Sequence, residues 1–171
     1  MASSTVLQGL PPLLSPATRL IILGSFPGLA SLRAQQYYGH PQNQFWRLLA
    51  TLLSPDPVAL LQAPYVERVH WLLAQDIGVW DVYASCEREG SLDSAIRNAQ
   101  PNDLGTLRTR CPQLQAIAHN GGESFRHARH TQALGVPVYR LPSTSPANAS
   151  WSFERKLAAW SDVLNHHGVG V

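Results

Sequence analysis

One segment of the chain, residues 24–46, combines side chains that suit recognition of a flat and polar ring. It reads GSFPGLASLRAQQYYGHPQNQFW. The residues His40 and Asn43 are polar groups, and the aromatic faces beside them belong to Tyr37, Tyr38, Phe45 and Trp46. A base that is extruded from a nucleic acid needs stacking on its face and hydrogen bonds at its edge. The alternative is that the aromatic residues belong to the core and that Asn43 only caps a helix beginning near Phe45.

The beginning of this segment is typical of a tight turn that exposes backbone amides. Gly24 and Gly28 bracket Ser25 and Phe26, and glycine allows the backbone to approach a ligand closely. We expect the N–H groups around Ser25 and Phe26 to form hydrogen bonds with negative charge as it develops on a departing group.

Further along the chain, two single polar residues are candidates for ligand binding. Asp81, in GVWDVY, either accepts a hydrogen bond from a ligand or is a strand-end carboxylate held by backbone N–H groups. Asn120 precedes a glycine, so it either binds a ligand or only forms a turn. Residues 87–89 are expected to form a solvated turn, and His127 and His130 are expected to face solvent on a helix.

The segment LPSTSPANAS, residues 141–150, is rich in small hydroxyl side chains and lies ahead of an expected helix. Hydroxyls and free N–H groups before a helix N-terminus are good ligands for phosphate. The alternative is an ordinary connector rich in Pro and Ser. The candidate phosphate ligands with a hydroxyl group are Ser143, Thr144 and Ser145.

The elements that must position these residues are short apolar runs, typical of buried parallel strands. We expect strands at residues 19–23, 78–82, 115–119 and 136–141, separated by helical stretches. This order predicts an α/β fold: one three-layer α/β/α domain over residues 1–171, with a central four-stranded, mainly parallel sheet. In such a sheet ligands bind beyond the carboxyl ends of the strands, where the polar segments would meet.

Composition agrees with a folded domain and excludes several classes of protein. The 171 residues are 44% hydrophobic and 14% charged, which excludes a disordered chain. The net charge of +2 permits a nucleic-acid partner if positive charge gathers in one groove. Cys86 and Cys111 form no CxxC pair, so we expect free buried thiols, no metal site and no cofactor. The N-terminus does not read as a signal peptide and no run is long enough to span a membrane, so we expect a cytoplasmic protein. We also expect it to act as a monomer.

Read as ILGSFPG…SL…QYYGHPQNQFW, the first segment resembles the first motif of the uracil-DNA glycosylase superfamily, and most closely that of its deoxyinosine (hypoxanthine)-DNA glycosylase branch. Residues 78–96 and 141–150 resemble further motifs of this family, so the resemblance covers nearly the whole chain. It implies a monofunctional glycosylase that flips a deaminated base out of damaged DNA and hydrolyses its N-glycosidic bond, leaving an abasic site for base-excision repair. Hypoxanthine is the favoured base, and uracil and xanthine stay open.

The resemblance also implies roles for individual residues. Relatives place a water-activating Asn or Asp inside the turn, where this chain has Phe26, and in the similar branch that role passes to Asn43. Leu141 replaces a His or Asn that contacts the base in several relatives. The implied base-binding residues are Gly24, Ser25, Phe26, Tyr38, Phe45, Asp81 and Asn120, and the implied DNA-binding residues are His40, Pro142, Ser143, Thr144 and Ser145.

Other interpretations stay open at the level of sequence. A hydrolase that uses Ser25, His40 and Asp81 lacks the G-x-S-x-G context, and a flavodoxin-like nucleotide domain lacks a phosphate-loop fingerprint. A non-catalytic DNA-binding module fits the loss of the turn Asn. The lone lysine, Lys156, falls in the last expected helix, so we expect no amine in the site to form a Schiff base and no lyase step.

Overall fold

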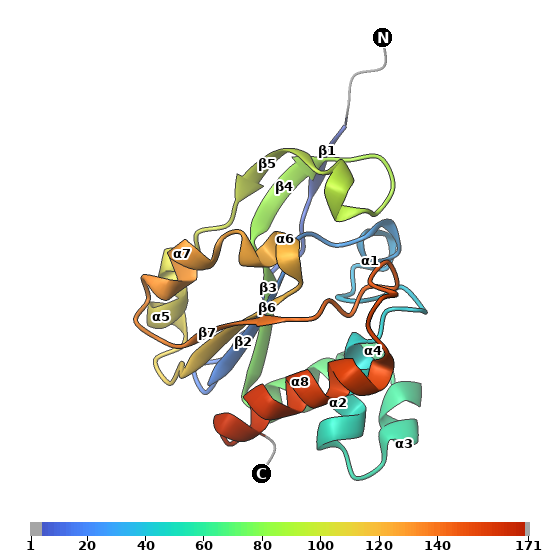
Figure 1. Ribbon diagram of the computed structural model, residues 1–171, viewed down its shortest axis with the longest axis vertical. Helices are drawn as coiled ribbons and strands as arrows, with labels where there is room; N and C mark the ends of the chain where they lie inside the picture. Colours follow the sequence, from blue (N-terminus) through green and yellow to red (C-terminus); the bar gives the residue numbers. More distant parts are fainter. Residues whose placement is uncertain (1–4, 170–171) are drawn as a thin grey trace.

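The computed structural model describes residues 5–169 and has a four-stranded parallel sheet at its centre (Figure 1). The strand order is β3–β2–β6–β7. The strands are β2 (Leu20–Gly24), β3 (Ile77–Asp81), β6 (Ala116–Asn120) and β7 (Val138–Leu141). Every residue of β2, β3 and β6 is buried, which explains why these strands are mostly apolar rather than alternating. The predicted α/β fold is confirmed, and each predicted strand overlaps an observed one.

Helices cover both faces of this sheet. Helices α2, α4 and α8 contribute to the core on one face, and the short helix α5 contributes to the core on the other, where α7 also packs near β7. The helices are α1 (Leu29–Ala34), α2 (Phe45–Leu53), α3 (Pro57–Gln62), α4 (Tyr65–Ala74), α5 (Leu107–Arg110), α6 (Gly122–Phe125), α7 (Ala128–Gln132) and α8 (Phe153–His166). Two short 3₁₀ turns, η1 (Asp93–Ala95) and η2 (Leu104–Thr106), lie in the connections.

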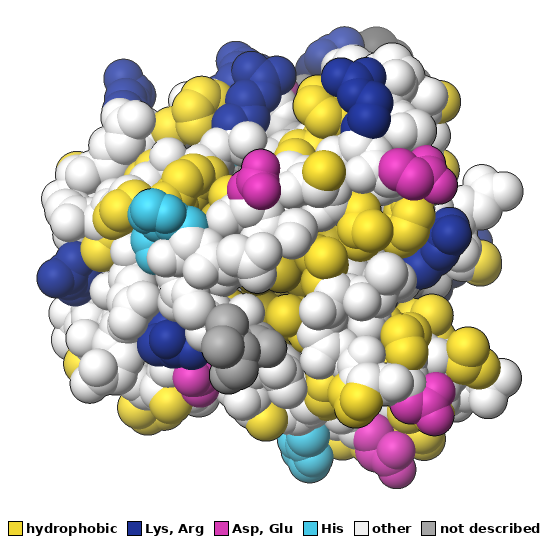
Figure 2. All heavy atoms as spheres, turned by 60° about the horizontal axis from the view of Figure 1, so that its bottom comes forward, with side chains coloured by type: hydrophobic (Ala, Val, Ile, Leu, Met, Phe, Trp, Pro, Cys, Tyr) yellow, Lys and Arg dark blue, Asp and Glu magenta, His cyan; other side chains and the backbone are white. Residues whose placement is uncertain are grey.

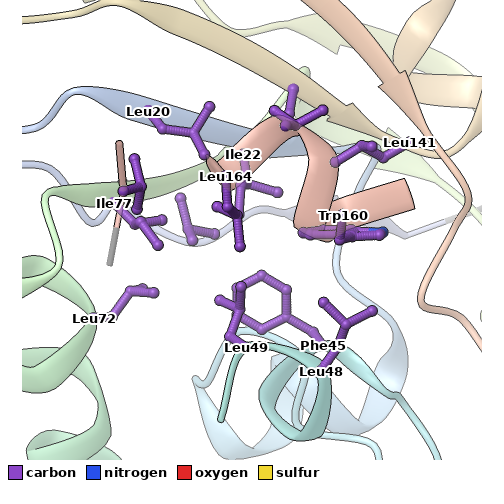
Figure 3. Packing of buried hydrophobic residues seen from close by; sticks show 14 of the residues in the cluster. Leu20, Ile22, Phe45, Leu48, Leu49, Leu72, Ile77, Leu141, Trp160 and Leu164 are labelled. Atoms are coloured by element: carbon purple, nitrogen blue, oxygen red, sulfur yellow. The ribbon is translucent and has the colours of Figure 1, made fainter. Parts of the chain in front are cut away.

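The core on the first face ties the start of α2 to the sheet and to α8 (Figure 3). Leu20 and Ile22 of β2 point into this core, together with Phe45 of α2 and Trp160 of α8. The rings of Phe45 and Trp160 meet edge to face, with centroids 6.3 Å apart. Because Phe45 is the first residue of α2, this contact also fixes the backbone just before the helix, where Asn43 lies.

A second, antiparallel sheet is an element that the sequence analysis did not predict. It has the order β1–β4–β5 and consists of β1 (Val6–Gln8), β4 (Tyr83–Glu87) and β5 (Arg97–Pro101). Strand β5 reads RNAQP and is largely exposed, so it has no apolar alternation to reveal it. Strand β4 follows β3 after a single residue, Val82, so in sequence it looks like part of the loop.

The expected solvated turn at residues 87–89 is wrong for Arg88, which follows β4. Arg88 is only 9% exposed, and its guanidinium group lies over the Phe26 ring, 5.4 Å from the centroid. It donates hydrogen bonds to the carbonyl groups of Pro27 and Gly90. Arg88 therefore supports the turn after β2 from behind. The sequence did not reveal this role, because a charged residue in a polar stretch normally lies on the surface.

The described residues hold no disulfide, metal cluster or membrane-spanning helix. Cys86 and Cys111 are free and buried. Within residues 5–169, no three or more His, Cys, Asp or Glu side chains gather where they could hold a metal ion. In the same part of the chain, no helix combines the length and the apolar character needed to cross a membrane. The face at the bottom of Figure 1 mixes apolar and charged side chains, and its Lys and Arg side chains are spread out rather than gathered (Figure 2).

Candidate active site

A cleft of about 900 Å³ lies at the carboxyl edge of the parallel sheet, where the four polar segments meet. It brings together every residue that the sequence indicated for base or DNA contact, with the exception of Phe45. The residues in its wall include Gly24, Ser25, Phe26, Tyr38, His40, Asn43, Asp81, Asn120, Pro142, Ser143, Thr144 and Ser145.

Gly24, at the end of β2, makes room for two functional groups in the wall of this cleft. A Cβ atom at this position would come within 2.5 Å of Oδ1 of Asp81 and 3.1 Å of the hydroxyl oxygen of Tyr38. The first distance is shorter than any ordinary contact, so a side chain here would displace the carboxyl group. Glycine therefore allows Asp81 and Tyr38 to approach the same point of β2.

Asp81, the last residue of β3, is buried without a stabilising partner for its side chain. It is only 4% exposed, and its Oδ2 atom has no hydrogen-bond partner among residues 5–169. Burial, and to a lesser extent the negative charge of Asp93, raise the pKa of this carboxyl group from 3.8 to about 7, against an opposing effect of Arg88. The alternative of a strand-end carboxylate held by backbone N–H groups is therefore not supported.

Tyr38 and Phe45 form an aromatic stack beside this carboxyl group. Their ring centroids are 4.0 Å apart, with 23° between the ring planes. Tyr38 has a φ of 54°, uncommon for a residue with a side chain, and its hydroxyl accepts a hydrogen bond from Nδ2 of Asn120 at 3.2 Å. Phe45 is fully buried and does not line the cleft. It supports Tyr38 from behind, so of the two rings only Tyr38 can meet a base.

Asn43 lies half-buried in the cleft wall, directly before α2. Its Oδ1 atom accepts a hydrogen bond from the N–H group of Phe45 at 2.9 Å, so Asn43 caps the first N–H group of α2 through an Asx turn, from the position before the N-cap residue Gln44. Among residues 5–169, the Nδ2 group of Asn43 donates to no protein acceptor, and Oδ1 keeps a second lone pair. The two interpretations of Asn43 are therefore compatible, because the cap orients the amide and leaves part of it free to hold a water.

The segment after β7, residues 142–148, is called the serine loop below. Its start is held from behind, since the indole N–H of Trp160 donates to the carbonyl of Pro142 at 3.1 Å. Ser143 Oγ accepts from the N–H of Ser145, and Ser145 Oγ accepts from a backbone N–H two residues further on. The hydroxyl protons of both serines remain available to a phosphate oxygen.

Asn120 and Thr144 fix the serine loop to the end of β6. Nδ2 of Asn120 donates to the hydroxyls of Tyr38 and Thr144, and its Oδ1 accepts from the Thr144 N–H at 3.0 Å. The carbonyl of Thr144 accepts from the N–H of Gln44 at 3.0 Å, and Thr144 is fully buried. The expected contact of its side chain with DNA is therefore not supported, because its hydroxyl is committed inside the protein.

Arg140 is a candidate DNA-binding residue that the sequence analysis missed. Among the described residues in the cleft wall, it is the single Lys or Arg. It lies just before the serine loop and is exposed, with its guanidinium group 5.8 Å from the centroid of the Phe125 ring. A signal was available, because Arg140 is the one charged residue in VPVYRL and lies near the carboxyl end of its strand.

The turn after β2 keeps backbone donors free for a ligand. Ser25 donates its hydroxyl proton to Asp93 at 2.6 Å, which joins the turn to η1. Within residues 5–169, the N–H groups of Ser25 and Phe26 donate to no protein acceptor. Both residues line the cleft. Their N–H groups are therefore available for the role that the sequence predicts, which is to stabilise negative charge on a departing group.

The interpretation as a serine hydrolase is not supported by this geometry. The hydroxyl of Ser25 is bonded to Asp93, and Nδ1 of His40 accepts from the N–H of Gln42 at 3.0 Å. No described contact joins Ser25, His40 and Asp81 in the chain of hydrogen bonds that activates a serine nucleophile.

Two expectations about basic residues outside the cleft have different outcomes. Lys156 lies in α8, as expected, but it is only 2% exposed and donates to Oε1 of Gln44 at 2.9 Å. It is not in the cleft wall. His130 is exposed, whereas His127 is half-buried and forms a hydrogen bond with the hydroxyl of Tyr83 at 2.9 Å, so a fully solvated position is wrong for His127.

A pocket of this kind, at the carboxyl edge of a parallel sheet, with aromatic side chains in its wall and a loop of free hydroxyls, suits one extruded base and the backbone that carries it. The chain belongs to the uracil DNA glycosylase superfamily, whose family model matches residues 11–164. The resemblance seen in the motifs is thereby confirmed.

Individual relatives cover nearly the whole chain. It is 36% identical over 157 residues to a protein named hypoxanthine DNA glycosylase from Methanosarcina barkeri, with 92% of this chain and 97% of the relative covered. A protein of the same name from Methanosarcina acetivorans is 36% identical over 159 residues, with 93% and 98% covered. The solution NMR structure of a candidate uracil DNA glycosylase from Methanosarcina acetivorans matches with a TM-score of 0.84 at 35% identity, covering 96% of this chain and 99% of that one.

Proposed function

We propose that this protein is a hypoxanthine DNA glycosylase, a base-excision repair enzyme that hydrolyses the N-glycosidic bond of a flipped deaminated base in DNA. The observation that carries this proposal is the convergence of Asn43, Asp81, Tyr38 and the serine loop on one cleft. The relatives named hypoxanthine DNA glycosylase support the choice of base. The protein acts as a monomer in this proposal, because one chain supplies all of these groups.

The first task of such an enzyme is to hold the base outside the stack. Unstacking costs a few kcal/mol and is cheapest for a mispaired base such as hypoxanthine. Ser143, Ser145 and Arg140 bind the flanking phosphates, and the exposed Pro146 at the tip of the serine loop enters the gap that the base leaves. The base then stacks on Tyr38 and presents its edge to Asp81.

The second task is to break the bond between the base nitrogen and C1′. The bonding electron pair leaves with the base, and the N–H groups of Ser25 and Phe26 stabilise the negative charge that develops there. A water held by Asn43 adds its oxygen to C1′ and releases its proton to solvent or to the departing base. Asn43 does not take that proton, because an amide is not basic near neutral pH; it orients the water. The products are the free base and an abasic site.

The third feature of the proposed reaction is that it stops at hydrolysis. A lyase step needs an amine that attacks C1′. Lys156, the one lysine of the chain, is buried against Gln44 and outside the cleft wall.

The test uses duplex and single-stranded oligonucleotides that each carry one deoxyinosine, deoxyuridine or deoxyxanthosine. We expect release of free hypoxanthine and a strand that breaks only after alkali treatment, with less or no release from undamaged controls. An Asn43→Ala protein serves as the control for contaminating activity. Tight binding to deoxyinosine DNA without release of any base would support a non-catalytic DNA-binding module and overturn the proposal.

A further inference from the structure

The Asp81 carboxyl group occupies an environment that disfavours its charged form. A buried carboxylate is normally paired with a cation or with several N–H donors, because the loss of hydration is otherwise very costly. Neither kind of partner is present for its side chain among residues 5–169, where Oδ2 is buried without a hydrogen bond. The one hydrogen bond to Asp81 from another side chain reaches its backbone carbonyl, from Nδ2 of Asn102.

The charged and titratable groups around Asp81 do not supply a counter-charge. Asp93, on η1, carries the same sign and raises the pKa of Asp81. Arg88, beyond β4, lowers it, but the Arg88 guanidinium group donates to two backbone carbonyls and lies in no ion pair with Asp81. Tyr37 and Tyr38, before α2, have pKa values raised by their burial and then by Asp81, so both phenols stay protonated.

An unpaired carboxyl group in the wall of the cleft matches one kind of ligand edge. Hypoxanthine has a ring N–H next to a carbonyl oxygen, and uracil and xanthine have the same pair, so all three present a lactam edge. A neutral carboxylic acid has one O–H donor and one carbonyl acceptor, and it can form two hydrogen bonds with that edge. A carboxylate can accept from the ring N–H but repels the neighbouring carbonyl oxygen.

We infer that Asp81 works as a neutral carboxylic acid that reads the lactam edge shared by deaminated bases. This inference rests on the proposed glycosylase function and specifies how its base site works. The inference predicts the reaction rate and its pH dependence. It does not explain how adenine is rejected, because a carboxylic acid can also match the reversed donor and acceptor pattern of adenine. Gly24 has a part in this role of Asp81, because a Cβ atom at this position would come within 2.5 Å of Oδ1 and would displace the carboxyl group.

The inference fixes the direction of the pH dependence. The pKa of Asp81 is raised to about 7, so the neutral form predominates below neutral pH and is lost as the pH rises. The value of kcat/KM on deoxyinosine DNA should then fall by about tenfold per pH unit above neutrality, since kcat/KM reports ionisation in the free enzyme. A bound lactam favours the neutral form, so the fall in kcat should begin at a higher pH than the fall in kcat/KM.

The decisive variants are Asp81→Asn and Asp81→Ala, compared across pH with the unmodified protein. Asn has the shape of the neutral acid, donates and accepts side by side, and does not ionise. We expect D81N to be at least about tenfold more active than D81A at pH 8. This difference corresponds to one pair of buried hydrogen bonds, which Asn keeps and Ala loses. The rate of D81N should vary less than about threefold between pH 6 and pH 9, because the titrating group is gone. An inactive D81N together with a wild-type rate that rises with pH would show that the carboxylate is the working form, and would overturn the inference.

A second measurement keeps the inference testable whatever the variants do. The ¹³Cγ signal of Asp81 in the intact protein reports its ionisation directly, and we expect a midpoint near neutral pH that moves upward when free hypoxanthine is added. An Asp81 carboxyl group that is fully ionised at pH 5.5 would overturn the inference even if no variant folds.

The glycosylase function and the neutral-acid role of Asp81 can fail separately. Absence of base release by the wild-type protein counts against the glycosylase function, whereas release by the wild-type protein with loss in D81N counts only against the neutral acid.

Discussion

Replacing Asn43 by Ala removes one interaction that the structure shows, the hydrogen bond to Phe45, and one that we propose, the hold on the attacking water. Loss of the hydrogen bond to the Phe45 N–H should lower the free energy of unfolding by about 1 kcal/mol, the scale of one net hydrogen bond. Loss of the free part of the amide should lower the single-turnover rate on deoxyinosine DNA by about two orders of magnitude, the scale for one oriented group in a preorganised site. Binding of damaged DNA should change little, because Tyr38 and the serine loop remain.

Matched variants separate the two effects. Asn43→Ser keeps a side chain that caps well but removes the carboxamide from the cleft, so it should lose rate and keep most of its stability. Asp56→Ala removes a comparable cap from α3, away from the cleft, where Oδ1 of Asp56 accepts from the N–H of Ala59 at 3.1 Å. It should lose about 1 kcal/mol of stability and keep its rate. Asn43→Asp keeps the cap and can still orient water but repels the departing base, so its rate should lie between those of the wild-type protein and Asn43→Ala.

The measurements are single-turnover base release with enzyme in excess, and denaturant unfolding of the same preparations. Rates are compared per folded molecule, so a stability loss does not count as a catalytic one. A normal rate in folded Asn43→Ala protein would end the catalytic assignment of Asn43. The orientation of water would then have to come from another polar group of the cleft, with Asp81 the first to test.

Four further outcomes follow from the same geometry. Ser143→Ala should weaken binding to damaged and undamaged duplexes alike in a fluorescence titration, since phosphate contacts carry no base information; a loss confined to deoxyinosine DNA would contradict this. Arg140→Ala should reduce the slope of log K against log salt by about 1, and an unchanged slope would remove Arg140 from the DNA contact. Borohydride treatment during turnover should trap no covalent adduct with DNA, because Lys156 is buried; an adduct would show a lyase step. Gly24→Ala should lower kcat/KM by about tenfold or more while the protein still folds, because the added Cβ displaces the Asp81 carboxyl group; unchanged kinetics would mean that this close approach does not matter.

The strands of the central sheet could be predicted because burial on both faces leaves a strong signal in sequence. Residues 19–23, RLIIL, need no partner to be recognised as a buried strand. Strand β5, RNAQP, is held by backbone pairing with β4 rather than by apolar side chains, so its sequence is indistinguishable from a loop. The same applies to Arg88, because one of its two carbonyl partners, that of Pro27, belongs to a turn 61 residues away in the chain.

The location of the site could also be predicted from the sequence. Which of its side chains face the cleft, and which are bonded inside the protein, could not. The carboxyl edge of a parallel sheet gathers its loops whatever their sequence, so Asn43, Asp81 and the serine loop had to come close together. Whether a hydroxyl points into the cleft or into the protein depends on its partners in three dimensions. Thr144 is chemically as good a phosphate ligand as Ser143, yet it bonds to Asn120 and is buried.

Gln44 carries a consequence for how substitutions combine. Its backbone N–H bonds to Thr144 of the serine loop, its side chain accepts from Lys156, and its neighbour in the chain is Asn43. The Asn43 amide, proposed to hold the water, and the serine loop, proposed to bind DNA, are thus joined through one residue. Thermodynamic coupling between Asn43→Ala and Ser143→Ala should therefore exceed what two separate sites would show. Under the proposed function, a DNA strand that binds the serine loop in a shifted position should also displace the Asn43 amide. Weaker DNA binding and slower hydrolysis should then occur together.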